Sequence, residues 1–281
     1  MTDDEFIRYL AAKKSLDDRS LNAHVYARFV SELAAAGARL RVLELGGGIG
    51  TMAQRLAERG AFGSALPEYM LIDEQPHVIT EARRRCAALP FEVNALAIDA
   101  REFLHTQTGV WDVLIANAFL DLFELKSIVP LALRALKPGG LFYFTINFDG
   151  VTKLLPQIDA SYDEEIEALY HRTMDERVID GVRSGDSHSG SNLFMHLRAA
   201  GAHIMASGSS DWVVCAEENE YAHDDAFFLG CILGFFEESV GARSEINASR
   251  FRTWLNARRA QVARGELIYL AHQLDFVGRA R

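Results

Sequence analysis

Residues 44–50 combine an acidic side chain with a run of glycines, a pattern typical of a nucleotide-binding turn. The apolar stretch 40–45 ends on Glu44 and Leu45, and the residues after it include Gly46, Gly47, Gly48 and Gly50. Glycine lets the backbone turn tightly and lets a ligand approach main-chain atoms. A helix that starts there offers unpaired N–H groups at its first turn. We therefore expect a nucleotide-type ligand at this corner.

Polar side chains also end the next apolar stretches along the chain. Asp73 and Glu74 follow 69–72, Asp99 and Ala100 follow 91–97, and Asn117 follows 111–116. Acidic residues in such places serve either as ligand-binding groups or as N-caps of the helix that follows. Both interpretations of Asp73 and Asp99 remain open on this pattern alone.

The elements that must position these residues alternate between strand and helix. Strand patterns occur at 40–45, 69–72, 91–97, 111–116 and 141–147, with helical patterns near 51–60, 76–88, 100–106 and 122–136. Short apolar strands that alternate with helices indicate a parallel sheet covered on both faces. We predict an α/β fold with a doubly wound, mostly parallel seven-stranded sheet, completed by C-terminal strands.

The flanking segments lack this alternation of strands and helices. We expect three parts: an N-terminal helical lid over 1–36, a core over 37–150, and a helical substrate or lid region with closing strands over 151–281. The helix pattern at 245–264 carries arginines that suit an acidic substrate or a solvated face. The aromatic residues of the same region indicate lid core, a homodimer contact or an acceptor pocket; they are Trp212, Phe227, Phe228, Phe235 and Phe236.

The composition excludes several classes of protein. The 281 residues are 49% apolar and carry a net charge of −10, which suits a globular chain and argues against broad nucleic-acid binding. Cys86, Cys215 and Cys231 lack metal-site or disulfide spacing. The N-terminus is acidic, and no apolar run approaches the ~20 residues of a membrane span. We expect a cytoplasmic protein without a metal.

Five segments in register resemble the class I S-adenosylmethionine-dependent methyltransferases, which have a Rossmann-like fold. The stretch from Glu44 to Gly50 resembles motif I of that family, and the stretches ending at Asp73, Asp99 and Asn117 resemble the strand ends that follow. The stretch 135–141, Ala-Leu-Lys-Pro-Gly-Gly-Leu, resembles the turn before its fifth strand. Together they cover residues 38–147 in order.

The resemblance implies roles for individual residues. The cofactor would be S-adenosyl-L-methionine, with its methionine portion at the glycine turn, its ribose hydroxyls on Asp73 and its adenine amino group on Asp99. Glu44, Glu74, Ala100 and Asn117 would also lie at the cofactor. An arginine fork suits a carboxylate, so Arg19 is a further candidate for the cofactor's carboxylate.

Three alternatives share part of these patterns. Residues 48–53 formally match the fingerprint of an NAD-dependent oxidoreductase, although the loop begins too early after the strand. The glycine run partly resembles the spermidine synthase group of aminopropyltransferases, but Ile49 and Asn117 stand where that group has acids. A nucleotide-binding regulatory domain without turnover remains the third.

Methyl transfer needs little from the protein beyond positioning, so no catalytic triad is required. A base is needed only when the nucleophile arrives protonated. The candidates are His171, His188 and Asn117, each of which also has a purely structural interpretation. We predict methyl transfer to a small-molecule acceptor, because the chain is acidic and a lid-like half follows the core.

Overall fold

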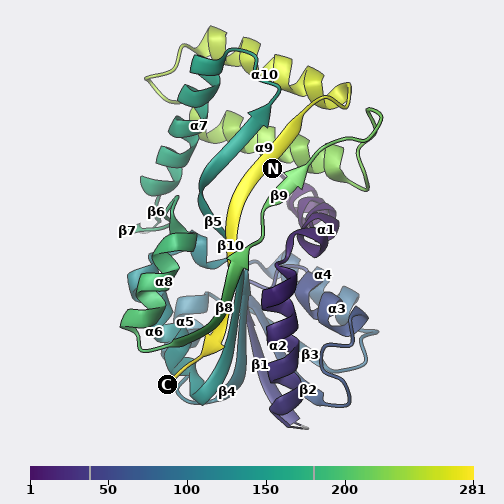
Figure 1. Ribbon diagram of the computed structural model, residues 1–281, viewed down its shortest axis with the longest axis vertical. Helices are drawn as coiled ribbons and strands as arrows, with labels where there is room; N and C mark the ends of the chain where they lie inside the picture. The colour runs from purple at the N-terminus through teal and green to yellow at the C-terminus, as the bar shows by residue number, and fades with distance from the viewer. Residues whose placement is uncertain (38, 180) are drawn as a thin grey trace.

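The computed structural model describes residues 1–37, 39–179 and 181–281. Figure 1 shows a twisted sheet in its lower half and a group of helices above it. The helices are α1 (Asp3–Ser20), α2 (Ala23–Ala35), α3 (Thr51–Glu58), α4 (Pro76–Cys86), α5 (Ala100–His105), η1 (Leu120–Leu122), α6 (Leu125–Ala135), α7 (Ala160–Asp175), α8 (Ser189–Ala199), α9 (Asp225–Val240) and α10 (Ala248–Ala263). The strands are β1 (Arg39–Leu45), β2 (Leu66–Asp73), β3 (Val93–Ala97), β4 (Trp111–Asn117), β5 (Leu136–Leu155), β6 (Val178–Ile179), β7 (Val182–Arg183), β8 (His203–Ser209), β9 (Trp212–Val214) and β10 (Ile268–Arg279).

The main sheet has the order β3-β2-β1-β4-β5-β10-β8, with β9 also paired to β10. Strands β1 to β5 are parallel, and β10 runs antiparallel to β5 and β8. This confirms the doubly wound, mostly parallel sheet. The prediction of seven strands is wrong, because eight strands form the sheet in the described part of the chain. The long strand β10 pairs with β8 through one half (Phe276 with Ser207) and with β9 through the other (Leu270 with Val213).

Alternate side chains of each strand build two separate cores. Val42 of β1 belongs to the core that α2, α3 and α4 cover, whereas its neighbour Leu43 belongs to the core under α5, α6 and α8. Helix α2 shows how a helix is held there: Phe29 is fully buried, and its ring stacks on that of Tyr143 at 4.2 Å. Each such buried side chain contributes roughly 1.5–3 kcal/mol of transfer free energy. The sheet is therefore packed on both faces.

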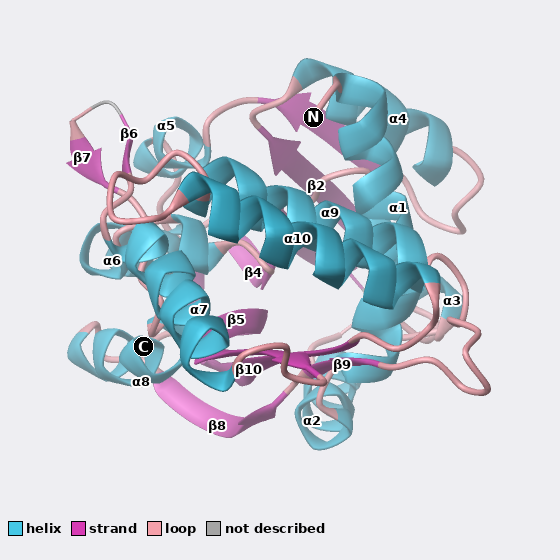
Figure 2. Cartoon of the chain, turned by 90° about the horizontal axis from the view of Figure 1, so that it is seen from above, coloured by secondary structure: helices cyan, strands magenta, loops and turns pink. Residues whose placement is uncertain are grey.

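A third core lies beyond the end of the parallel sheet. Strands β5 and β10 stay paired as far as Leu155 and Ile268, and α1, α7, α9 and α10 pack against this extension. We call these four helices, together with β9 and the extended strand pair, the cap. Seen from above, α9 and α10 lie side by side with α7 next to them (Figure 2). The cap stands over the carboxyl ends of the parallel strands.

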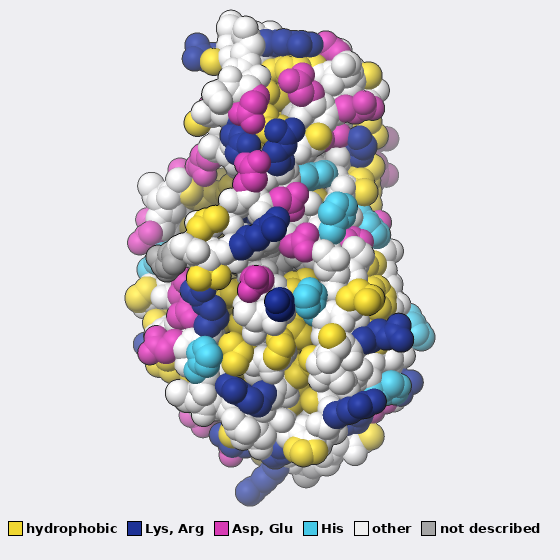
Figure 3. Space-filling model, turned by 90° about the vertical axis from the view of Figure 1, so that its left-hand side faces the viewer, with side chains coloured by type: hydrophobic (Ala, Val, Ile, Leu, Met, Phe, Trp, Pro, Cys, Tyr) yellow, Lys and Arg dark blue, Asp and Glu magenta, His cyan; other side chains and the backbone are white. Residues whose placement is uncertain are grey.

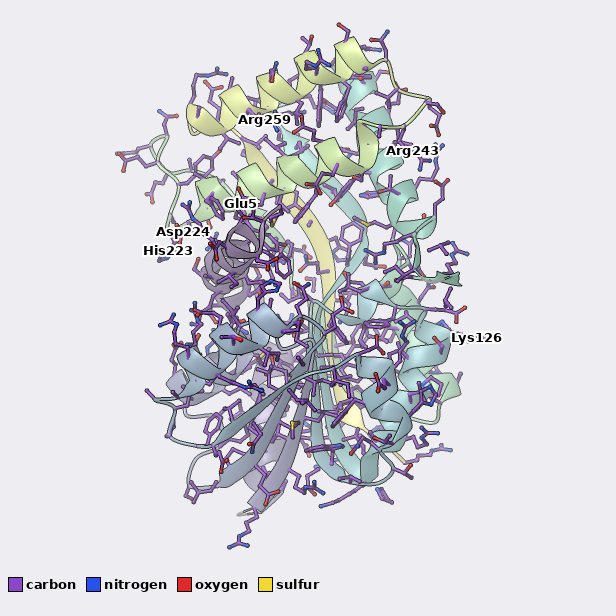
Figure 4. All side chains as sticks on the ribbon, turned by 180° about the vertical axis from the view of Figure 1, so that it is seen from behind. Glu5, Lys126, His223, Asp224, Arg243 and Arg259 are labelled. Carbon is purple, nitrogen blue, oxygen red and sulfur yellow. The ribbon has the colours of Figure 1, made fainter. Side chains whose placement is uncertain are left out.

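Most arginines near α10 are bound to carboxylates, which argues against a patch for an acidic substrate. Arg258 is completely buried and pairs with buried Asp163 at 2.7 Å. The ion pairs at the surface are Arg243 with Glu176, Arg250 with Asp159, Arg259 with Glu237 and Arg264 with Glu266. Figure 4 labels Arg243 and Arg259 in the upper part of the molecule. Arg250 and Arg259 connect α10 to the start of α7 and to α9, whereas the Arg264 pair lies within the segment after α10.

The outer surface carries both signs of charge. On the face drawn in Figure 3, Lys and Arg side chains alternate with Asp and Glu side chains, without one large patch of a single sign. Among the described residues, every helix is too short or too polar to cross a lipid bilayer.

Candidate functional site

The glycine turn links β1 to α3 at the carboxyl end of the sheet. Gly46 and Gly50 have φ angles of +59° and +83°, which favour glycine. A methyl group on Gly50 would lie 2.5 Å from Cys86 Sγ, and one on Gly46 would lie 1.9 Å from Cδ2 of Phe119. The turn therefore has room for no larger residue at either position.

Asp73 closes the turn from the end of β2. Its carboxylate accepts hydrogen bonds from the backbone N–H groups of Gly48 and Gln75, both at 3.1 Å. Burial raises the pKa of Asp73, and these backbone hydrogen bonds oppose the rise. Glu74, the next residue, is exposed. Asp73 thus connects the end of β2 to the glycine turn and to the start of α4.

Asp99 caps the helix that follows β3. Its Oδ1 accepts from the backbone N–H groups of Arg101 at 2.8 Å and Glu102 at 3.0 Å, and its Oδ2 lies 3.3 Å from the Arg101 guanidinium. Burial opposes ionisation, but the hydrogen bonds from Glu102 and Arg101 outweigh it and lower the pKa of Asp99. The neighbouring Ala100 is buried. These contacts confirm that Asp99 is the N-cap of α5, and the Arg101 guanidinium is the partner of its Oδ2.

Glu44 is buried beneath the turn. Its carboxyl group accepts a hydrogen bond from the Tyr69 hydroxyl at 2.6 Å. Burial raises the pKa of Glu44 to about 7, and the bond from Tyr69 partly opposes this. The contact joins β1 to β2 directly below the ligand-facing surface.

A cavity of about 790 Å³ brings most of the predicted site residues together. It lies between the carboxyl ends of β1 to β4 and the cap. The predicted residues in its wall are Glu44, Gly46, Gly48, Asp73, Glu74, Asp99, Ala100 and Asn117. Four others are not in the wall: Gly50, Arg19, His171 and His188.

Asn117 belongs to a polar cluster that fastens α1 to the end of β4. Its Oδ1 accepts from Thr145 Oγ1 at 2.7 Å, and its Nδ2 donates to Asp17 Oδ2 at 3.3 Å. Asp17 is 1% exposed and also accepts from Lys13 Nζ at 2.5 Å and Trp212 Nε1 at 3.1 Å. Through this buried carboxylate, helix α1, which covers one side of the cavity, is joined to both β4 and β9.

Replacing Asp17 with asparagine should loosen α1, because a neutral amide is a weaker acceptor for the N–H groups of Trp212 and Asn117, which lie outside α1. We expect hydrogen exchange of the α1 amides to accelerate roughly tenfold, or about 1.4 kcal/mol. Exchange followed by mass spectrometry measures this directly. The exposed change Asp4→Asn on the same helix should affect only its first turn. Equal protection of α1 in Asp17→Asn and the parent protein would contradict the role of this cluster.

The remaining candidates lie elsewhere. Arg19 pairs with Asp225 at 2.5 Å, so its charge is already bound within the cap. His171 lies behind the wall, where its Nε2 is 3.0 Å from Oγ1 of Thr152, which does line the cavity. Burial lowers the pKa of His171, and a His188 charge lowers it further. His188 itself is exposed and lies against Gly150. No group of three or more potential metal ligands occurs in the described part of the chain.

Two residues of the wall have a left-handed backbone although neither is glycine. Ala118 has a φ of 50° and Ile146 a φ of 57°, and both line the cavity. The N–H group of Ile146 donates to buried Asp275 at 2.8 Å, which holds this conformation in place. Such conformations cost on the order of 1–3 kcal/mol each and cluster at functional sites.

The half of the cavity under the cap is lined by residues that the sequence analysis did not predict to lie together. Its aromatic lining is Tyr9, Phe148, Tyr170, Trp212, Phe235 and Tyr269, and its polar lining includes Asp121, Thr152, Arg177 and Gln273. Of the aromatic residues that the sequence offers for an acceptor pocket, Trp212 and Phe235 line the cavity. Phe228 and Phe236 are buried core residues, and the Arg8 guanidinium lies over the ring of Phe227. Asp121 had a usable signal, because it follows the end of β4 by four residues. The others come from elements that only tertiary packing brings together.

Comparisons with known proteins agree with this geometry. Residues 42–140 match a family model described as a methyltransferase domain. A candidate methyltransferase of Bacillus halodurans has a similar structure, with a TM-score of 0.54, 13% identity, and coverage of 92% of this chain and 99% of that chain. The YcgJ protein of Bacillus subtilis has a TM-score of 0.53, with 13% identity and coverage of 92% and 99%. Identities this low establish likeness of fold. No curated protein matches the sequence significantly.

Proposed function

We propose that the chain is an S-adenosylmethionine-dependent methyltransferase and that it methylates a small molecule bound beneath the cap; the methyltransferase-domain match over residues 42–140 and the similar fold of known methyltransferases support this. The observation that carries this proposal is the continuity of the cavity. One wall holds the glycine turn and the acids that end β2 and β3, and the opposite wall holds aromatic side chains from the cap. A cofactor and a small acceptor can therefore meet in one continuous space.

The residues present fit the cofactor. We propose that the glycine turn holds the methionine portion, Asp73 the ribose hydroxyls and Asp99 the adenine amino group. Carboxylates suit a diol because they accept two hydrogen bonds. Glu74, Ala100 and Asn117 would complete this wall, whereas Arg19 would act only through its ion pair with Asp225.

The cofactor supplies a methyl group that its sulfonium has already activated. The chain's own residues must then hold the acceptor in line and exclude water. Positioning of this kind contributes roughly 7–11 kcal/mol in favourable cases. The aromatic lining and the cap, which we propose to act as the lid, keep the reacting atoms dry. If the acceptor is a hydroxyl or thiol, the neutral His171 imidazole is placed to take its proton through Thr152.

Calorimetry with S-adenosylhomocysteine, followed by mass spectrometry of a small-molecule acceptor panel, tests this proposal. We expect S-adenosylhomocysteine to bind. We also expect at least one acceptor to gain about 14 mass units, because a methyl group replaces a hydrogen atom. NAD binding more tightly would favour an oxidoreductase, and decarboxylated S-adenosylmethionine reacting faster would favour aminopropyl transfer. Cofactor binding without turnover across the panel would favour a regulatory domain.

A further inference from the structure

We propose that the acceptor is a primary or secondary amine on an apolar body, and that Asp121 recognises its ammonium form between Tyr9 and Tyr170. This inference rests on the methyl-transfer function proposed above. The substrate class is inferred from Asp121. Among the described acids that line the cavity, it is the one with a buried carboxylate oxygen that has no hydrogen-bond partner.

Asp121 lies on η1, just after β4, and lines the cavity. Its Oδ1 is buried and accepts no hydrogen bond from the described residues. Burial raises the pKa of Asp121 to about 6, and the charges of Arg177 and Lys13 keep it from rising further. The backbone N–H of Asp121 itself also opposes the rise, and the carboxylate is therefore ionised at neutral pH. A buried oxygen such as Oδ1 that lacks a partner is costly in a low-dielectric site, so a cationic donor would be favoured there.

Both nearby protein cations are held by other acceptors. The Arg177 guanidinium donates to the backbone carbonyls of Ser184 at 2.9 Å and of Asp121 at 3.4 Å. Lys13 donates to Asp17 at 2.5 Å. Their positions leave the side-chain carboxylate of Asp121 available to a ligand.

Two tyrosines complete the proposed ammonium site. The Tyr9 ring stacks on Phe228 at 5.9 Å and meets the edge of Phe235 at 5.4 Å, while the Tyr170 ring stacks on Phe236 at 4.0 Å. Burial raises the pKa of Tyr170 to about 12. The Arg177 charge opposes this rise, and the Asp121 charge contributes to it. Burial likewise raises the pKa of Tyr9, with Asp121 among the contributing charges. Neutral aromatic rings beside a carboxylate favour a cation over a neutral group.

An amine acceptor needs one proton acceptor before it can react, and the Asp121 side chain would serve as that acceptor. The ammonium first gives a proton to the Asp121 carboxylate, which leaves a neutral nitrogen with a free lone pair. That lone pair forms the new N–C bond while the S–C bond of the cofactor breaks, and sulfur keeps the electron pair of the broken bond. The net charge of −10 also favours the approach of cations to the protein.

The experiment compares two probes that share one apolar body. Protein saturated with S-adenosylhomocysteine is titrated by calorimetry at neutral pH with 2-phenylethylamine and with 2-phenylethanol. A hydrogen-bonded charge pair corresponds to a preference of about tenfold or more for the amine. Asp121→Asn should abolish this preference while alcohol binding stays the same. The matched control Glu124→Gln removes an exposed charge three residues away, and this variant should retain the preference for the amine.

The pH dependence and a second variant make the outcome decisive. Lowering the pH through about 6 protonates the carboxyl group, so amine affinity of the parent protein should fall toward that of Asp121→Asn. Thermal unfolding checks that each variant is folded, and Asp121→Ser replaces Asp121→Asn if needed. Equal affinity for the probes, no binding of the amine, or a preference that survives in the variants would overturn the inference. A preference for the alcohol would do so too and would favour the Thr152–His171 pair.

Binding of S-adenosylhomocysteine is measured first, without either probe. Its absence would contradict the proposed function. Intact binding without an amine preference would contradict only the assignment of the acceptor class.

Discussion

Replacement of Asp73 with alanine is expected to weaken S-adenosylhomocysteine binding by at least about tenfold. The proposed ribose contact is a hydrogen bond to a charged group, which corresponds to roughly 1.5–3 kcal/mol, and tenfold is about 1.4 kcal/mol. The change also removes the acceptor for the N–H groups of Gly48 and Gln75, so the glycine turn loses a support. Isothermal titration calorimetry measures the affinity directly.

Glu68→Ala is the matched control for this prediction. Glu68 is an exposed acid at the other end of the same strand, where it forms a surface ion pair with Arg41 at 3.4 Å. Its removal should leave the affinity within a factor of about two, because exposed pairs contribute little. An Asp73→Ala protein that is folded and binds with unchanged affinity would refute the ribose assignment.

Replacement of Arg258 with methionine is expected to lower the free energy of unfolding by about 3–5 kcal/mol. Arg258 and Asp163 are both buried, and the guanidinium also donates to the carbonyl of Pro156 at 2.8 Å. Methionine would fill part of the volume but would leave the Asp163 carboxylate buried without its counter-charge, which is the costly case for such pairs. Urea denaturation gives the difference at constant m-value.

The adjacent residue supplies the control. Arg259 pairs with Glu237 on the surface, and Arg259→Met should change the free energy of unfolding by no more than about 1 kcal/mol. Adding Asp163→Asn to Arg258→Met should restore part of the loss, since it removes the unpaired charge. Similar small effects of the two arginine substitutions would show that the buried pair does not stabilise the cap.

The core of the fold was predictable from local patterns. Glycines at 46, 48 and 50, an acid at 73 and another at 99 occur at the ends of apolar stretches, and parallel strands bring their carboxyl ends to one edge. The convergence of Gly46, Gly48, Asp73 and Asp99 on one cavity therefore follows from the order of the strands in the chain, although Gly50 lies outside the cavity wall. The strand count was wrong by one: β9 is a three-residue strand, and its separate place in the main sheet depends on its pairing with β10.

The sequence by itself determined the glycine turn, the strand-end acids and the doubly wound sheet, because each depends on residues close together in the chain. Only the tertiary structure decided that Arg19 binds Asp225, that Arg258 is the buried one among its neighbours, and that Asp121 lines the same cavity as Tyr9 and Tyr170. Those contacts join segments that are far apart in the chain. Their chemistry depends on burial and on partners, and a residue's type and spacing specify neither.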